Sequence, residues 1–293
     1  MSAEAILTQL VMGLTVGVNL VLVATGLTLV FGMMGVINFA HSALFMLGAY
    51  VALVSSARLG SFWLGLALAP LVLGVLGAVL ERFFLRPLRT RFPDSHLLPL
   101  LLTFGLGLFF EGAAKVLWGA DVVSLDKPRA LAGAVGLGRV TFPTYWLFAL
   151  GAAALLALLV WVVVERTSLG LSIRAATQDP TMAAVLGVDV RRLNTLVFGL
   201  GAALAAAAGV ILGTMTSLSP QMGGGIVLDA FIAIVIGGLG SFTGAIVGSL
   251  LLGQVQSFGV ALLPAFHTPL VFLVMAIVLV LRPSGLFGTA PRR

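Results

Sequence analysis

Apolar runs of membrane-spanning length recur along almost the whole chain, and this repetition restricts the fold more than any other feature. A helical run of about 20 apolar residues matches the thickness of the hydrocarbon core of a bilayer. Such runs occupy residues 6–31, 39–57, 62–80, 97–118, 145–164 and 194–215, followed by a longer run at 226–258 and a last one ending at Leu281. The pattern predicts an all-α polytopic membrane protein with about eight membrane-spanning segments.

The composition supports this fold class and excludes several kinds of site. The chain is 60% hydrophobic and only 9% charged, whereas a soluble domain contains about 25% charged residues. It has no cysteine, which excludes disulfides, thiol catalysis and Cys-ligated metals. The three histidines lack metal-motif spacing, and no G-x-x-x-x-G-K-[ST] sequence is present. We therefore expect no catalytic residue, no metal and no cofactor in this chain.

Most of the positive charge lies in three segments between or after the apolar runs, at residues 82–91, at 166–192 and after Leu281, where Arg282, Arg292 and Arg293 stand. Cytoplasmic loops of membrane proteins are enriched in Lys and Arg, so all three segments are expected on the cytoplasmic side. The N-terminus and residues 119–143 then lie outside. This placement of the arginines in short loops also argues against a nucleic-acid partner.

The long run at 226–258 is expected to be broken or re-entrant. Between Arg192 and Arg282 the chain must cross an even number of times, yet three apolar runs lie there. The Gly237–Gly240 turn is the natural break, because irregular backbone interrupts membrane helices where glycine occurs. Asp229 is expected to cap the first half-helix, with a role near the outer mouth as the alternative.

A similar break is predicted in the first part of the chain. Gly32 and Gly35 interrupt an apolar stretch, and Asn38 and His41 follow immediately. Polar groups at membrane depth are costly unless they face protein or a water-filled cavity. Two roles stay open: Asn38 and His41 hydrogen-bond backbone groups freed by the break, or they line a path.

The two breaks suggest an internal repeat. Gly48 follows the pair Gly32-x-x-Gly35, and Gly253 follows the pair Gly237-x-x-Gly240. The number of residues between the pair and the following glycine is the same in both. Each unit then leads through one more apolar run to a Leu-Arg-Pro sequence, first at residues 85–87 and again at 281–283. Transporters are often built from such repeats, with the substrate path at the repeat interface. The breaks are therefore candidate path elements, with the residues Gly32, Gly35, Asn38, His41, Gly237 and Gly240.

The cytoplasmic loop at residues 165–193 carries a second candidate site. Asp179 is a good N-cap, Pro180 suits the first helical position and Gly187 suits the position after the end. These signals predict a short helix at residues 180–186 that could dock into a groove on another protein. The alternative is an ordinary surface loop that contacts lipid through arginines. The candidate docking residues are Asp179, Pro180, Thr181, Met182, Ala183, Ala184, Gly187 and Arg191.

Four segments of the chain resemble a known family. GLTLVFGMMGVINFAHSALFMLGAY (26–50), SIRAATQDPTMAAVLGVDVRRL (172–193), DAFIAIVIGGLGSFTGAIVGSLLLG (229–253) and VLRPSGLFG (280–288) are similar, in this order, to the permeases of branched-chain amino acid ABC importers. The resemblance implies the shorter of that family's two permease kinds, with residues 1–293 as a single transmembrane permease domain and 165–193 as its ATPase-coupling loop. It implies a bacterial-type cytoplasmic (inner) membrane location.

The resemblance also implies the partners and the mechanism. They are a second, longer permease subunit, two cytoplasmic ATPase subunits that bind the ATP, an extracytoplasmic substrate-binding protein and membrane lipids. Branched-chain or other hydrophobic amino acids would cross by alternating access. Two departures are His41-Ser42-Ala43, where many relatives carry His-Gly and often an acidic residue, and Met182-Ala183-Ala184, which lacks the Glu of the usual coupling loop. Alternatives are a permease for urea or short amides, a stand-alone secondary transporter, and a membrane enzyme.

Overall fold

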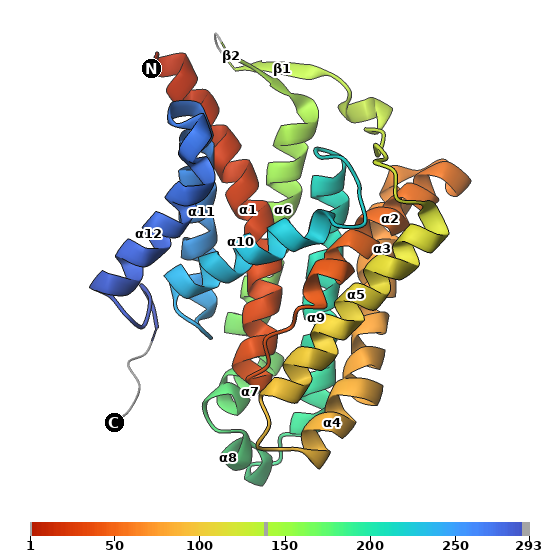
Figure 1. Cartoon of the computed structure of the whole chain (residues 1–293), viewed down its shortest axis with the longest axis vertical. Coiled ribbons are helices and arrows are strands. Elements are labelled where there is room, and N and C mark those ends of the chain that lie inside the picture. The colour runs from red at the N-terminus through yellow and green to blue at the C-terminus, as the bar shows by residue number, and fades with distance from the viewer. Residues whose placement is uncertain (1, 138–139, 289–293) are drawn as a thin grey trace.

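Long helices make up most of the computed structural model, which describes residues 2–137 and 140–288 (Figure 1). The first half contains α1 (Ala3–Met34), α2 (His41–Leu59), α3 (Phe62–Leu80), α4 (Arg86–Arg91) and α5 (Leu97–Trp118). The second half contains α6 (Thr144–Arg166), α7 (Ser168–Gln178), α8 (Pro180–Val185), α9 (Val190–Gly213), α10 (Met222–Gly237), α11 (Phe242–Leu262) and α12 (His267–Leu281).

Short elements connect these helices. A π-helix, η1 (Glu81–Leu85), joins α3 to α4, and two 3₁₀ turns are η2 (Arg129–Leu131) and η3 (Pro264–Phe266). The strands β1 (Ala134–Leu137) and β2 (Val140–Pro143) form an antiparallel hairpin in which Ala134 pairs with Pro143.

The predicted membrane spans are confirmed. Among the described residues, eight helices are long and apolar enough to cross a membrane, and α10 is a shorter apolar helix. The predicted runs at 62–80 and 97–118 coincide with α3 and α5. The last helix ends at Leu281 as predicted. The other boundaries differ by a few residues in either direction: α1 extends past its run at both ends, whereas α2 starts later and α9 ends earlier than predicted.

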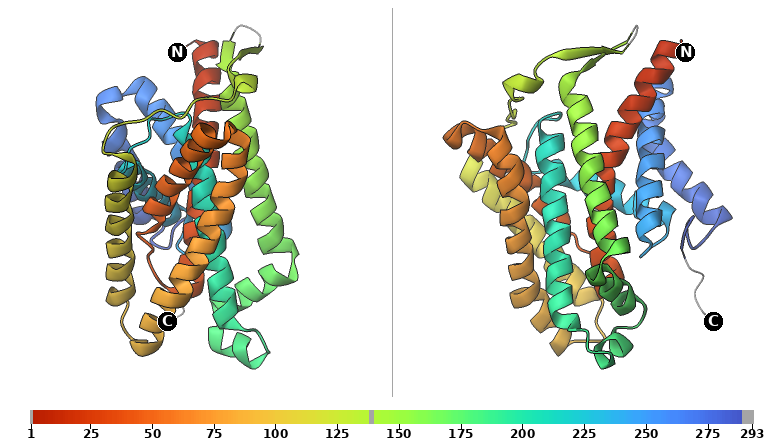
Figure 2. Two further views of the ribbon diagram at one scale, coloured as in Figure 1. Left: turned by 90° about the vertical axis from the view of Figure 1, so that its right-hand side faces the viewer. Right: turned by 180° about the vertical axis from the view of Figure 1, so that it is seen from behind.

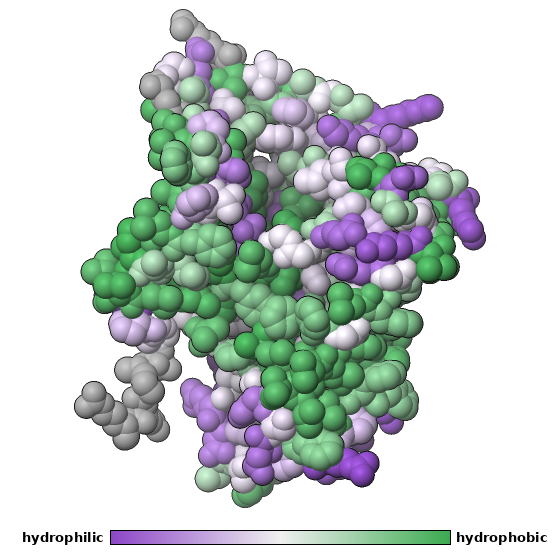
Figure 3. Space-filling view, viewed as in Figure 1, coloured by the Kyte–Doolittle hydropathy of each residue, from purple (hydrophilic) through white to green (hydrophobic). Residues whose placement is uncertain are grey.

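The orientation of the helices agrees with the charge pattern. The N-terminus and the β1–β2 hairpin lie at one end of the molecule, and α4, α7 and α8 lie at the other (Figures 1 and 2). The basic segments at 82–91 and 166–192 therefore share one end, as predicted. Arg282 directly follows α12, which ends well short of that end in both figures, and Arg292 and Arg293 fall outside the described residues. Figure 3 shows an apolar band between the two more hydrophilic ends, as expected for a chain embedded in a bilayer.

The helices α1 and α9 form the buried centre of the bundle. The most apolar window of each is 78% buried, and α9 carries the small-residue stretch AALAAAAG. Small residues let membrane helices approach closely. A Cβ atom on Gly48 of α2 would lie only 2.4 Å from the Cα of Ala206 in α9, so the backbones of these helices are in direct contact.

The run at 226–258 is broken as predicted. The helix α10 ends at Gly237 and α11 begins at Phe242. In Figure 1, α10 lies obliquely across the front of the bundle and α11 returns toward the N-terminal end. The segment thus enters and leaves on the same side, one of the two solutions that the charge pattern allowed.

The prediction that Asp229 caps this helix is wrong. The helix begins at Met222, with Gln221 in the N-cap position, so Asp229 lies in its middle. The glycines that precede Asp229 form helix here, although glycine has a low helix propensity. A Cβ on Gly223 would lie 2.0 Å from the carbonyl oxygen of Ser42, so tertiary packing against the start of α2 requires this glycine.

The two units of the predicted repeat have the same order of elements. Each contains a helix, a break, two further helices and a Leu-Arg-Pro sequence, in α1–α3 and in α10–α12. Gly48 and Gly253, which occupy equivalent positions in the two units, both lie against the backbone of another helix. Gly48 packs on α9, and a Cβ on Gly253 would lie 2.5 Å from the Cα of Gly17 in α1. The second helix of each unit therefore packs on one of the two central helices.

Candidate translocation path and coupling segment

The first break separates α1 from α2 by a short non-helical segment. Gly35 ends α1 in the left-handed conformation, with φ of 62°, and its N–H donates to the carbonyl oxygen of Phe31 at 2.8 Å. Glycine adopts this conformation without a steric penalty. Residues 35–38 have no helical structure, and α2 starts at His41.

Thr103 of α5 holds the backbone of this break. Its hydroxyl oxygen lies 3.2 Å from the N–H of Phe39, which donates to it, and 3.2 Å from the carbonyl oxygen of Ile37. The same hydroxyl lies 3.0 Å from the carbonyl oxygen of Leu100 in its own helix. Sequence reasoning missed Thr103, although it is the only hydroxyl-bearing residue in the apolar run at 97–118.

His41 and Asn38 do not take the backbone role considered for them. His41 is fully buried, and its Nε2 lies 3.2 Å from the carbonyl oxygen of Val23, within α1 rather than in the break. Since a carbonyl oxygen only accepts, Nε2 carries the proton. Both polar atoms of the Asn38 side chain are buried without a hydrogen-bond partner among the described residues. Buried polar groups normally have partners, so path lining stays the prediction for Asn38.

Replacing Thr103 with valine is expected to weaken the break. The change keeps the shape of the side chain but leaves the Phe39 N–H without its partner, which costs about 1–3 kcal/mol of stability. The loss of stability is measured as a lower midpoint of thermal unfolding of the purified complex in detergent. Thr103→Ser, which keeps the hydroxyl, is the control, and an equal loss in both variants would contradict the hydrogen-bonding role.

The second break is closed by the end of the chain. The N–H groups of Leu286 and Phe287 donate to the carbonyl oxygens of Ile236 and Gly237 at 2.9 and 2.8 Å. These carbonyls lie in the last turn of α10 and lack partners within the helix. Ser241 then caps α11, because its hydroxyl accepts from the N–H of Gly244 at 3.0 Å. The VLRPSGLFG sequence therefore has a structural role that the sequence alone did not indicate.

The two breaks meet in space. A Cβ on Gly32 would lie 3.9 Å from the Cα of Gly240 and 3.3 Å from the Cγ2 of Thr177 in α7. Gly32 and Gly240 thus come together as candidate path residues, beside α7. His41 lies elsewhere. Its Cε1 would be 3.2 Å from a Cβ on Gly26, which lies nearer the N-terminal end of α1 than Gly32 does. We refer to the contact of Gly32, Gly240 and Thr177 as the junction.

The predicted short helix of the coupling loop is present as α8. The Oδ1 of Asp179 accepts from the N–H groups of Thr181 and Met182, each at 2.9 Å. At the other end Gly187 has φ of 93°, and Val188 N–H donates to the carbonyl oxygen of Ala183 at 3.0 Å. This is the Schellman pattern. The helix ends one residue earlier than predicted, at Val185, because Leu186 is its C-cap.

Two parts of the coupling loop differ from the prediction. The residues before Asp179 form α7, a helix of 11 residues that was not expected. Ala183, one of the candidate docking residues, is only 2% exposed, because it packs inward on the bundle. The exposed apolar residues of α8 and its C-cap are instead Met182, Val185 and Leu186, at 56%, 78% and 76% exposed. They belong to α8 and its C-cap, at the end of the molecule opposite the N-terminus (Figure 1).

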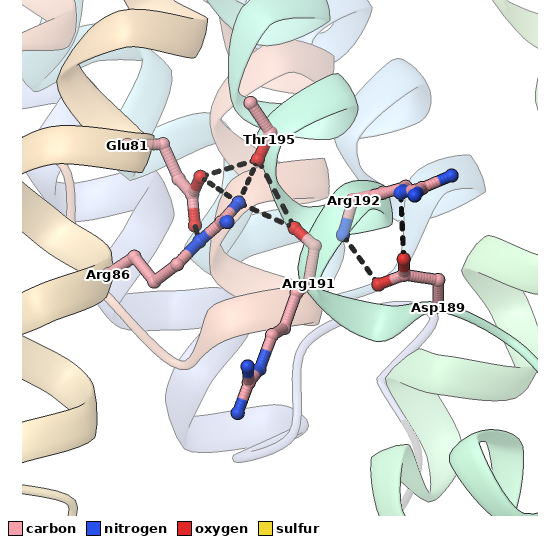
Figure 4. Close-up of polar contacts among 6 residues, drawn as sticks. All are labelled: Glu81, Arg86, Asp189, Arg191, Arg192 and Thr195. Atoms are coloured by element: carbon pink, nitrogen blue, oxygen red, sulfur yellow. Dashed lines mark hydrogen bonds and ion pairs between the residues drawn. The ribbon is translucent and has the colours of Figure 1, made fainter.

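A buried ion pair anchors α9 next to this loop (Figure 4). Glu81 is 1% exposed, and its Oε2 lies 2.9 Å from the Nη2 of Arg86. Thr195 donates to the same carboxylate at 2.6 Å, and Arg86 donates to the carbonyl oxygen of Arg191 at 2.9 Å. The Arg191 side chain points away from the cluster. The cluster thus links the end of α3 to the first turns of α9.

The π-helix η1 makes this pair possible. Glu81 and Arg86 are five residues apart, so on an α-helix their side chains would point about 140° apart. The N–H of Arg86 donates instead to the carbonyl oxygen of Glu81, which is the wider π turn, and such turns are frequent at functional sites. The sequence analysis placed Arg86 in the basic segment at 82–91 and in the repeated Leu-Arg-Pro sequence, but did not predict that it pairs with Glu81.

Comparisons with known proteins give a consistent result. Residues 9–281 match the profile of the family described as branched-chain amino acid transport system, permease component. The chain is 33% identical to the high-affinity branched-chain amino acid transport system permease protein BraD of Pseudomonas aeruginosa, over 96% of this chain and 95% of that one. It is 31% identical to LivH of Escherichia coli over the same shares. Among solved structures, PsaBC from Streptococcus pneumoniae in complex with Fab matches with a TM-score of 0.45 and 17% identity, covering 94% of this chain and 89% of that one.

Proposed function

Because this chain belongs to the family of branched-chain amino acid transport permeases, we propose that it is one membrane subunit of an ATP-driven importer for branched-chain and other hydrophobic amino acids. As a member of that family it is a transport permease and a multi-pass protein of the cytoplasmic (inner) membrane. The observation that supports coupling to an ATPase is α8, a short capped helix that presents exposed apolar side chains at the cytoplasmic end.

The proposed assembly has five kinds of component. This chain, as a single transmembrane domain, pairs with a second, longer permease. Two cytoplasmic ATPase subunits bind and hydrolyse the ATP, since this chain carries no Walker motif. A binding protein delivers the substrate from outside, and lipids surround the pair. A groove on one of the ATPases receives the tip of α8, in the way that a helix docks its apolar face into a partner.

The proposed mechanism is alternating access. The helix α8 follows α7 directly, and Thr177 of α7 touches Gly32 at the junction, where Gly240 of the second break also lies. A displacement of α8 by the ATPase would therefore reach both breaks through one helix of 11 residues. The nucleotide state shifts the equilibrium between outward-open and inward-open forms by its differential affinity for them. Asn38 lines the path, and His41 ties α2 to α1.

The substrate class rests on the family. BraD and LivH are named as branched-chain amino acid permeases, and an apolar path suits an apolar side chain. The family match does not favour the alternatives of a urea permease, a stand-alone secondary transporter or an enzyme.

Transport by the reconstituted importer tests this function. Proteoliposomes that contain this chain, its partner permease and both ATPases should take up labelled leucine when ATP and the binding protein are supplied. Liposomes without the ATPases are the control and should show no accumulation. Accumulation driven by an ion gradient in that control would overturn the proposal.

A cysteine in place of Met182 is expected to crosslink to the ATPase. The chain has no native cysteine, and Met182 is exposed on α8, so a single labelled position results. Crosslinking in membranes should change in yield between the ATP-bound and nucleotide-free states, as measured on gels. Leu59→Cys, exposed at the outer end of α2, is the control. Equal crosslinking from both positions would contradict docking at α8.

A further inference from the structure

A pocket of about 290 Å³ lies between α10, α11 and α12, away from the junction. Its polar lining consists of Asp229, Gln256, His267 and Thr268, and the remaining walls are apolar. Ligand pockets in proteins usually have volumes of about 300–1,000 Å³. This pocket is therefore sized for a small solute.

The pocket lies in the outer half of the membrane region. The helix α11 ends and α12 begins at the end of the molecule that carries the N-terminus (Figure 1), and His267 and Thr268 are the first residues of α12. Asp229 is in the middle of α10. A carboxylate at this depth does not face hydrocarbon without a large penalty, so this face borders a partner or a water-filled path. Figure 3 shows hydrophilic atoms at the edge of the hollow above α10.

The polar groups of the pocket mainly accept hydrogen bonds. His267 Nδ1 lies 2.8 Å from the carbonyl oxygen of Pro264 and must donate to it. In the neutral ring Nε2 is then an acceptor, so the Thr268 hydroxyl, 3.2 Å away, donates to it. The lone pairs of that hydroxyl and the Asp229 carboxylate remain as acceptors. The Gln256 amide already donates a hydrogen bond to the Asp229 carboxylate. A ligand that fits the remaining acceptors is rich in donors, as a primary ammonium group is.

The walls of the pocket decide between an organic and an inorganic cation. They include Leu228, Ile232, Val260 and Phe272, which give an inorganic ion no ligands but cover an aliphatic side chain well. The helix α10, which carries Asp229, also contacts the first break, since its Phe231 packs on Phe39 with ring centroids 5.6 Å apart. A ligand bound at Asp229 therefore contacts α10, the helix that touches the first break and ends at the second.

We propose that this pocket is a subsite for an aliphatic amino acid in the outer half of the path, and that Asp229 binds its α-ammonium group. This subsite rests on the transport function proposed above and specifies where the substrate first binds to the permease. It also assigns the role of substrate discrimination to α10, whose two ends are held by the start of α2 and by the C-terminal segment.

Protection of a cysteine in the pocket tests the subsite. In membrane vesicles that hold the whole importer without its binding protein, Val260→Cys is alkylated with a small maleimide, and the label on this chain is quantified. Leucine and 3-methylbutylamine should slow the alkylation at least threefold, whereas 4-methylpentanoate, which lacks the ammonium, should not. Adding Asp229→Asn should abolish the protection by leucine. Adding Glu111→Gln, which removes a carboxylate on α5, should leave it intact.

Uptake separates this subsite from the general function. With the binding protein present, Asp229→Asn should lower leucine uptake about tenfold or more, because the ammonium group then meets a neutral amide oxygen instead of a carboxylate and the charge-assisted hydrogen bond is lost. Co-purification of the ATPases shows that the variant assembles. Protection that persists in Asp229→Asn, or equal protection by 4-methylpentanoate, overturns the subsite. If the unaltered importer transports leucine but Val260→Cys is never protected, the subsite is wrong and the transport function stands. Absence of ATP-driven uptake by the unaltered importer refutes the function itself.

Discussion

Replacing Gly209 with leucine is expected to prevent assembly of a stable permease. A Cβ atom at this position would lie 2.0 Å from the carbonyl oxygen of Phe45 and 2.9 Å from its carbonyl carbon. The obstacle is the backbone of α2, which cannot rotate away as a side chain can. Overpacking a core typically costs about 1–3 kcal/mol, and we expect this substitution to exceed that range because α2 and α9 must separate. Fluorescence-detected size-exclusion chromatography of detergent extracts should show loss of the monodisperse peak.

Two further substitutions calibrate this result. Gly209→Ala adds only the Cβ and should destabilise less than leucine, although alanine gains about 1 kcal/mol in helix propensity over glycine. Gly151→Ala on α6 has the same propensity gain, and among the described residues no atom lies within 4 Å of its added Cβ. It should be neutral or stabilising. A Gly209→Leu variant as heat-resistant as the unaltered protein would refute direct backbone contact between α2 and α9.

Replacing Arg86 with alanine is expected to cost about 3–5 kcal/mol, because it leaves a buried charge without its partner. Glu81 is 1% exposed and would keep only the Thr195 hydroxyl as a donor. Adding Glu81→Gln should restore part of the lost stability, since the uncompensated carboxylate is then removed. The midpoint of thermal unfolding of the single and double variants gives the coupling between the two positions. No recovery in the double variant would contradict the ion-pair explanation.

An exposed ion pair in the same region is the matched control. Arg192 and Asp189 are 2.9 Å apart, but their side chains are 86% and 52% exposed. Surface pairs contribute about 0–1 kcal/mol, so Arg192→Ala should change the unfolding midpoint little. Both arginines lie next to the coupling loop, and the contrast between them isolates the effect of burial.

Much of the local structure could be predicted from the sequence. The apolar runs located the membrane helices, and the arginines correctly predicted that the segments at 82–91 and 166–192 lie at the same end of the molecule. Asp179, Pro180 and Gly187 marked α8 to within one residue, because caps act through hydrogen bonds within a single turn. The break at Gly237–Gly240 followed from counting crossings. These features depend on neighbouring residues or on composition along a run.

The partners of the breaks could not be predicted. Thr103 reaches the first break from a position more than 60 residues away, and Leu286 closes the second from the end of the chain. Many residues in an apolar chain have the same local pattern as Thr103. Asp229 was misplaced because the glycines before it look like a loop until their packing on α2 is known. The pair of Glu81 and Arg86 depends on a π turn that no local signal indicated.

The sequence by itself determined that the chain is a helical membrane permease, where its helices run, which two basic segments share one end and where the short helix α8 lies. Hydrophobic length, charge asymmetry and helix caps are properties of short stretches, so they can be recognised before the chain is folded. Only the tertiary structure decided that Gly32 meets Gly240 beside α7, that the polar atoms of Asn38 have no partner among the described residues, and that Asp229 shares a pocket with Thr268. These contacts join residues far apart in the chain, so they follow from the way the helices pack and not from any local pattern.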